Sequence, residues 1–225
     1  MRRSGSIAFL LLATAGCAGT AMAQDSGQGT GIAVGVLAGT NGLGLEVGYR
    51  FNERFGVHAN NGAYSYDHTV DSGDFDIDGK AKLKSIGLLA DFYPLGGSFR
   101  ISAGLRSNHN KFDGVATPNS STVEIGGDTY TASQVGTLVG AAKFKKTAPT
   151  LLVGWAGHYH TGLHFGVELG VVAQGSPRLA ATSNGSLASN PTFQADLADK
   201  LAEWQDDVKD YKLWPVVQMH LAYRF

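Results

Sequence analysis

The sequence predicts an all-β protein, an eight-stranded antiparallel transmembrane β-barrel with one amphipathic helix in its last long loop. Charged residues make up 16% of the 225 residues, against about 25% in typical soluble domains. Glycine accounts for 31 residues, roughly twice its usual share. Apolar and polar residues alternate with a period of two in eight segments, which is the pattern of strands with two different faces.

The N-terminus has the features of an export signal. Two arginines precede an apolar stretch, and Ala21-Met22-Ala23 supplies the small residues of a cleavage site. A short buried helix and lipidation at Cys17 are the alternatives. We therefore expect a signal peptide over residues 1–23 and a mature barrel domain over residues 24–225. The formal net charge of −1 disfavours nucleic acid as a partner.

The eight alternating segments are the expected strands. The longer segments match the ~9–11 residues that a tilted strand needs to cross a bilayer. One face is apolar, and the other carries glycine and charged residues, as in a narrow barrel with lipid outside and a polar lumen. A soluble β-sandwich is the alternative. The segments are 32–37, 43–51, 55–60, 86–93, 99–106, 150–156, 163–172 and 213–225.

The connections between these segments differ in length. Asn41-Gly42 predicts a tight hairpin turn. An even number of strands places both chain ends on one side, and in outer-membrane barrels the short turns lie on that periplasmic side. The expected short turns are 52–54, 95–98 and 157–162, and the expected long outer loops are 67–73, 113–143 and 176–212.

The last long loop contains a helix signal. Asn190-Pro191 resembles a helix start, with proline in the first turn. Apolar residues then recur at spacings of three and four, as on one face of a helix. This helix could pack on the barrel rim or on neighbouring loops, or it could form a lid over the barrel mouth. The apolar positions are Phe193, Leu197, Leu201, Trp204, Val208 and Tyr211.

Charged residues on the polar strand faces should line the lumen. Since an eight-stranded barrel barely holds its own side chains and buried charges must pair, they form either a structural plug or a narrow pathway for a small solute. We expect Arg106 to pair with one or both of the acids Glu46 and Glu168. The lumen-lining charged and polar residues are Glu46, Arg50, His58, Asp91, Arg100, Arg106, Glu168, His220 and Arg224.

Other motifs carry less chemistry. The run Asp74-x-Asp76-x-Asp78-Gly79 imitates a calcium loop but lacks the carboxylate at its end. Period two explains it better, with a β-bulge before Ile86 and a charged ladder lining the outer mouth. No catalytic constellation stands out, so we expect no enzyme, cofactor or metal. A lipid-modifying barrel enzyme is a remaining alternative.

Three short motifs, at residues 91–94 (Asp-Phe-Tyr-Pro), 148–151 (Ala-Pro-Thr-Leu) and 174–178 (Gln-Gly-Ser-Pro-Arg), are similar to those of a known family. The chain resembles the carbapenem-resistance-associated outer-membrane proteins, also called ornithine-uptake porins. This resemblance implies an eight-stranded barrel, proposed to admit small amino acids and carbapenems.

The expected function is therefore a narrow channel in the outer membrane of a Gram-negative bacterium, for small polar or zwitterionic solutes such as amino acids. The alternative is a non-transporting structural or surface-interaction barrel. The expected partners are outer-membrane lipid, amino-acid-like solutes and the barrel-assembly machinery, for which Tyr223 and Phe225 would form the assembly signal. A monomer is expected.

Overall fold

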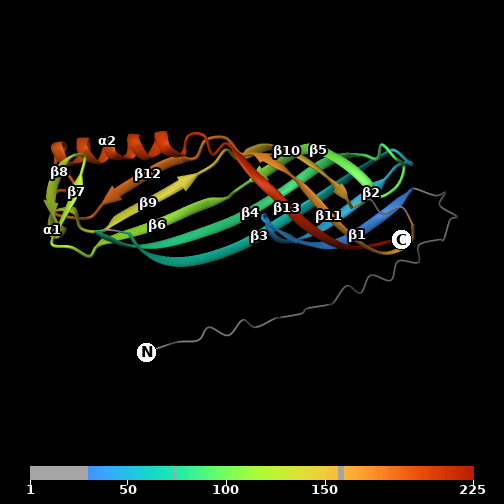
Figure 1. Cartoon of the computed structure of the whole chain (residues 1–225), viewed down its shortest axis with the longest axis horizontal. Coiled ribbons are helices and arrows are strands. Elements are labelled where there is room, and N and C mark those ends of the chain that lie inside the picture. The colour runs from blue at the N-terminus through green and yellow to red at the C-terminus, as the bar shows by residue number, and fades with distance from the viewer. Residues whose placement is uncertain (1–29, 73, 157–159) are drawn as a thin grey trace, which may run out of the picture.

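The strands form a closed ring in the structure, a computed structural model that describes residues 30–72, 74–156 and 160–225. The strands are antiparallel, in the order β4-β3-β2-β1-β13-β11-β10-β5, and β5 pairs with β4 to complete the ring (Figure 1). The ring consists of β1 (Gly31–Gly39), β2 (Gly42–Arg50), β3 (Phe55–Ser72), β4 (Phe75–Phe92), β5 (Phe99–Asn108), β10 (Thr147–Trp155), β11 (Gly162–Ala173) and β13 (Leu213–Arg224). The predicted signal peptide lies outside the described residues.

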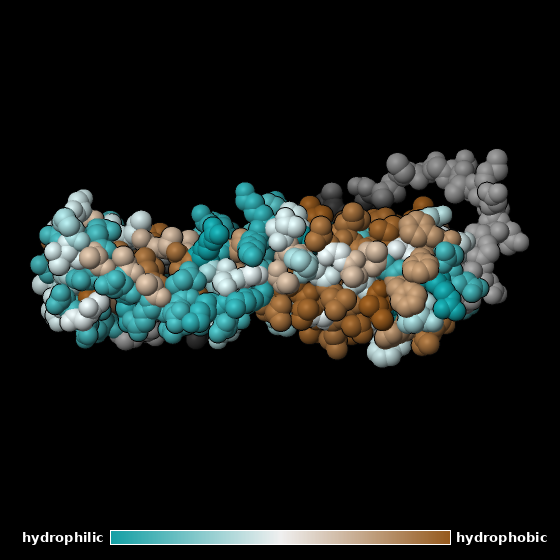
Figure 2. Space-filling model, turned by 90° about the horizontal axis from the view of Figure 1, so that it is seen from above, coloured by the Kyte–Doolittle hydropathy of each residue, from teal (hydrophilic) through white to brown (hydrophobic). Residues whose placement is uncertain are grey.

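The two faces of the barrel wall differ sharply in polarity. Leu43, Leu45, Ile86 and Leu88 point outward and are 59–64% exposed, and hydrophobic residues form a belt around the barrel half of the molecule (Figure 2). The interior holds charged side chains instead. A protein with an apolar exterior and a charged interior is matched to lipid rather than water. Within the described residues, neither helix is long and apolar enough to span a membrane.

Two strands extend far beyond the barrel. β3 and β4 are 18 residues each and pair without interruption. β4 pairs with β5 over Ser85–Phe92 and with β6 over Phe75–Lys82, so the same sheet continues outward from the barrel on the outer half of β4. We call this outer part of the sheet the sheet extension. It consists of the outer parts of β3 and β4 with β6 (Lys111–Pro118), β9 (Leu138–Lys143) and β12 (Arg178–Ser183).

Smaller elements cover one face of the sheet extension at its far end. They are β7 (Thr122–Ile125), β8 (Asp128–Thr131), α1 (Ala132–Val135) and α2 (Pro191–Val208). Asn190 caps α2, since its Oδ1 accepts hydrogen bonds from the backbone N–H groups of Thr192 and Phe193 at 2.9 and 3.2 Å. Phe193 and Leu197 are buried in a cluster with the β7–β8 hairpin.

The position of α2 shows whether this helix packs on neighbouring elements or forms a lid over the barrel mouth. α2 contacts β12 and β7, begins at the far end of the sheet extension and lies along it on the way back towards β13 (Figure 1). Its C-terminal half is less covered, and Trp204 is 41% exposed. In this structure α2 therefore packs on neighbouring elements and does not close the barrel mouth.

Several expectations about the outer segments were wrong. The segments expected as long loops contain β6, β7, β8, β9 and β12, and the run 67–73 is largely strand. No β-bulge precedes Ile86, because even-numbered residues of β4 face outward throughout. They are apolar where the strand borders the barrel and charged beyond it, so the charged ladder lies on the outer face and not at the mouth. The first hairpin turn is Thr40–Asn41, one residue earlier than expected, and Gly42 begins β2 at a φ of 94°.

Candidate functional site

A cluster of charged side chains fills the middle of the barrel. Three carboxylates face one guanidinium and two imidazoles, contributed by six of the eight barrel strands, and every one of these side chains is at most 3% exposed. The members are Glu46 on β2, His58 on β3, Asp91 on β4, Arg100 on β5, Glu168 on β11 and His220 on β13. We call this group the Arg100 cluster.

Arg100 joins all three carboxylates. Its Nε donates to Glu168 Oε1 at 2.5 Å, and its Nη2 lies 3.2 Å from both oxygens of Glu46. Its Nη1 lies 3.8 Å from Asp91 Oδ2. A guanidinium has five N–H donors in a planar fork, so a single arginine can serve several acids. Arg100 is therefore the central cation of the lumen.

The two histidines bridge carboxylates. His220 places Nε2 2.8 Å from Glu168 Oε2 and Nδ1 3.3 Å from Glu46 Oε2. His58 places Nδ1 2.8 Å from Asp91 Oδ1 and Nε2 3.9 Å from Glu46 Oε2. A neutral imidazole has one N–H, whereas both nitrogens of each ring face acids. Each imidazole therefore links carboxylates that come from two different strands.

Neutral side chains complete the hydrogen bonding of the acids. Ser102 donates to Asp91 Oδ1 at 2.5 Å, and Gln218 Nε2 donates to Glu168 Oε2 at 2.9 Å. The sequence analysis did not select these two residues because it considered only ionisable groups. Their parity along β5 and β13, two residues from Arg100 and His220, is the signal that would have found them.

Arg106 does not pair with an acid, contrary to the prediction. Its Nη1 donates to Ser85 Oγ at 3.0 Å and its Nη2 to Asn60 Oδ1 at 2.8 Å. Arg106 lies six residues beyond Arg100 on β5, towards the sheet extension, and is 2% exposed. The acids lie within reach of the Arg100 guanidinium instead, because a long arginine side chain can place its charged group far along the barrel from its own Cα atom.

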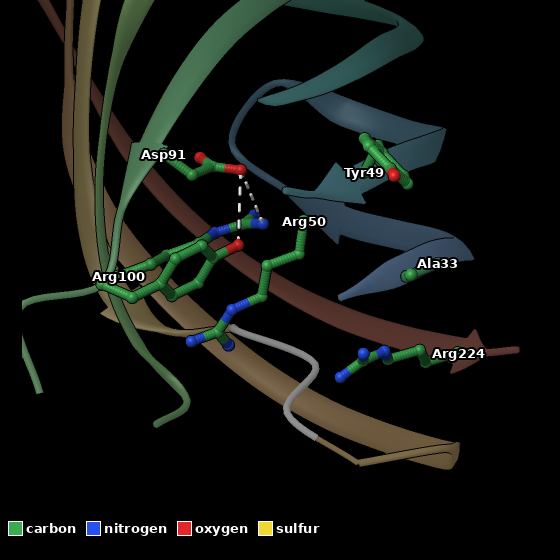
Figure 3. A pocket seen from close by; sticks show the side chains of 9 residues that line it. Ala33, Tyr49, Arg50, Asp91, Arg100 and Arg224 are labelled. Atoms are coloured by element: carbon green, nitrogen blue, oxygen red, sulfur yellow. Dashed lines mark hydrogen bonds and ion pairs between the residues drawn. The ribbon is translucent and has the colours of Figure 1, made fainter. Parts of the chain in front are cut away.

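The remaining predicted lumen residues lie at the opposite end of the barrel, which has the short turns. Arg50 donates to the carbonyl oxygens of Glu53 and Gly96 at 2.5 and 2.7 Å, and its guanidinium carbon lies 3.8 Å from the centre of the Tyr93 ring. Arg224 donates to the carbonyl oxygen of Thr30. Figure 3 shows Arg50 and Arg224 lining the same pocket as Asp91 and Arg100.

The described residues leave little free space at this end of the lumen. The cavity between these side chains has a volume of about 10 Å³, which is the space of one water molecule. Arg50 connects the β2–β3 turn to the β4–β5 turn across the opening. The terminal aromatic residues lie on the other side of the wall, where Tyr223 and Phe225 are 45% and 66% exposed.

Three members of the Arg100 cluster lie close enough together to hold a metal ion. One ligand atom each from Glu46, Glu168 and His220 lies within 4.8 Å of the others, an arrangement that could hold a metal ion. However, Arg100 lies 2.5–3.2 Å from the oxygens of both acids. A cation bound there would have to displace the guanidinium, so the cluster fits an ion-pair network better.

These features define a class: a closed β-barrel with a lipid-facing exterior, an ion-paired lumen and a sheet extension at one end. No family model and no curated protein sequence matches the chain. Among solved structures, CarO2 of Acinetobacter baumannii is similar with a TM-score of 0.60 and 19% identity, over 88% of this chain and 100% of that one. CarO of the same organism gives a TM-score of 0.56 and 16% identity, over 87% and 98%. The chain thus has the fold of these outer-membrane barrels, and the resemblance inferred from the sequence is confirmed at the level of the fold.

Proposed function

We propose that the protein is a monomeric outer-membrane barrel forming a narrow conduit for small polar or zwitterionic solutes such as amino acids. In this proposal the short-turn end faces the periplasm and the sheet extension stands outside the cell. Tyr223 and Phe225 serve as the signal for the barrel-assembly machinery. The Arg100 cluster closes the conduit at its centre.

The observation that carries the proposal is a layer of unsatisfied donors above the acids. Asn60 must turn Oδ1 towards Arg106, because a guanidinium only donates, and Asn108 uses Oδ1 to accept from the backbone N–H of Asn110 at 3.0 Å. Arg106 Nε and both amide nitrogens are buried without an acceptor among the described residues. This layer offers one positive charge and three donor nitrogens to a carboxylate.

The next layer has the opposite character. Asn60 is the cross-strand neighbour of Glu46, so the donor layer adjoins the Arg100 cluster. Arg100 is shared among three carboxylates, and an incoming ammonium group could replace it at one acid while it keeps the other two. A solute with a carboxylate and an ammonium therefore matches the two layers in order.

The test is solute flux into proteoliposomes. We expect zwitterionic amino acids to enter faster than neutral polyols of similar size, and the Arg106→Gln variant to lose this preference while polyol entry is unchanged. The matched control is Lys200→Gln, which removes one positive charge from the exposed surface of α2. Equal entry of both solute classes through the unaltered protein would refute the proposal.

A non-transporting surface-interaction barrel is the second candidate. The closed packing of the Arg100 cluster and the ordered sheet extension both favour it. In that case the barrel anchors the extension, and flux stays at the level of protein-free liposomes for every solute and every variant.

A further inference from the structure

Four cations lie side by side across the sheet extension. Lys82 on β4 pairs in register with Lys111 on β6, Lys111 with Lys143 on β9, and Lys143 with Arg178 on β12. Residues directly opposite each other in antiparallel strands project from the same face. The four side chains therefore form one row, which we call the basic row.

The basic row has too few acids of its own. Asp113 lies 2.9 Å from Lys111 and 4.0 Å from Lys82, and its hydrogen bond to Lys111 holds the pKa of this carboxyl below its usual value. Among the described residues, no carboxylate lies within 4.0 Å of Lys143 or Arg178, and both are exposed. Like charges directly opposite each other destabilise a sheet, so this arrangement calls for an external anion.

The position of the row identifies the source of that anion. Lys82 and Lys84 lie on the same outward face of β4 as the lipid-facing Ile86 and Leu88. Strands rise about 3.3 Å per residue, so Lys82 is roughly 13 Å beyond Ile86 along a tilted strand. In Figure 2 the hydrophilic surface begins directly where the hydrophobic belt ends. The row is thus at the level of lipid headgroups, which flexible lysine side chains can reach.

We propose that the basic row binds the phosphate groups of anionic lipids in the leaflet that surrounds the sheet-extension end of the barrel. This inference uses the membrane placement of the proposed function but not its solute pathway. Lipid binding and solute flux are measured separately, so either can fail without the other.

The test compares two double variants with the same loss of charge. Lys143→Gln/Arg178→Gln removes half of the basic row, whereas Lys200→Gln/Lys209→Gln removes one cation on α2 and one at its C-cap, both of which have acidic partners on that helix. Detergent-solubilised full-length protein is titrated with fluorescent lipid A, a phosphorylated glycolipid, and with the same lipid after removal of its phosphates. Heat modifiability on gels checks that each variant is folded.

We expect the basic-row variant to bind phosphorylated lipid A about 30-fold more weakly, since each cation near an anionic surface contributes about 1 kcal/mol. The α2 variant should bind like the unaltered protein. Three outcomes would overturn the proposal: equal binding of the dephosphorylated lipid, unchanged affinity of the basic-row variant, or full competition by inorganic phosphate at the same phosphate concentration. The last outcome would indicate a site for free anions.

Discussion

Arg100 and Arg106 offer a direct comparison of two buried arginines on one strand. Both are at most 2% exposed, yet Arg100 contacts three carboxylates and Arg106 contacts only neutral oxygens. Removing one partner of a buried ion pair costs about 3–5 kcal/mol, because an uncompensated charge remains. Leaving a neutral acceptor unsatisfied costs about 1–3 kcal/mol.

We therefore expect Arg100→Met to lower the free energy of unfolding by about 3–5 kcal/mol. Arg106→Met should cost less, because it also removes a buried charge that has no carboxylate within 4.0 Å among the described residues. The assay is equilibrium unfolding in urea with the protein in lipid vesicles, followed by tryptophan fluorescence. Equal losses for both variants, or a larger loss for Arg106→Met, would refute the assignment of Arg100 as the central cation.

Three further predictions concern other parts of the molecule. The hydrogen bond from Tyr130 to Asp196, together with burial, raises the pKa of Tyr130 to about 12 from 10.0, so its stabilisation should be complete below pH 10 and lost as the pH rises towards 12. The readout is the fluorescence of Trp204 on α2, in a background with phenylalanine at the other two tryptophans. In this background Tyr130→Phe should not show the loss of stability at high pH. Gly104→Ala should reduce the folded fraction on gels, because its Cβ would lie 2.1 Å from the Leu88 carbonyl oxygen, whereas Gly114→Ala meets nothing within 4 Å and should fold normally. Deletion of Phe225 should slow assembly by the barrel-assembly machinery in a reconstituted assay, whereas Phe51→Ala, which removes another exposed ring, should not.

The barrel wall was predictable because its physics is local. In a strand that separates lipid from lumen, the parity of a residue decides which side it faces, so Glu46, Arg100 and Glu168 could be assigned inward without knowledge of the partner strands. The pairing of these residues was not predictable. It depends on strand tilt and on the reach of side chains, and for that reason Arg100 rather than Arg106 meets the acids.

The sheet extension was missed for a different reason. β9 and β12 are six residues each, and each contains two alanines, so their two faces barely differ in polarity. Such short strands are stabilised by their neighbours in the sheet and by α2 rather than by their own pattern. The β-bulge expected before Ile86 was wrong for another reason. Along β4 the outer face passes from lipid to water, and this change of surroundings looks in the sequence like a change of face.

The continuity of β4 has a mechanical consequence. One unbroken strand carries Lys82 on the outside and Ser85, which contacts Arg106, on the inside only three residues away. The pairing of β4 with β3 is continuous from the sheet extension into the barrel. A force applied to the sheet extension, by a binding partner or by lateral pressure of the lipids, should therefore tilt the barrel strands whose side chains contact the lumen arginines.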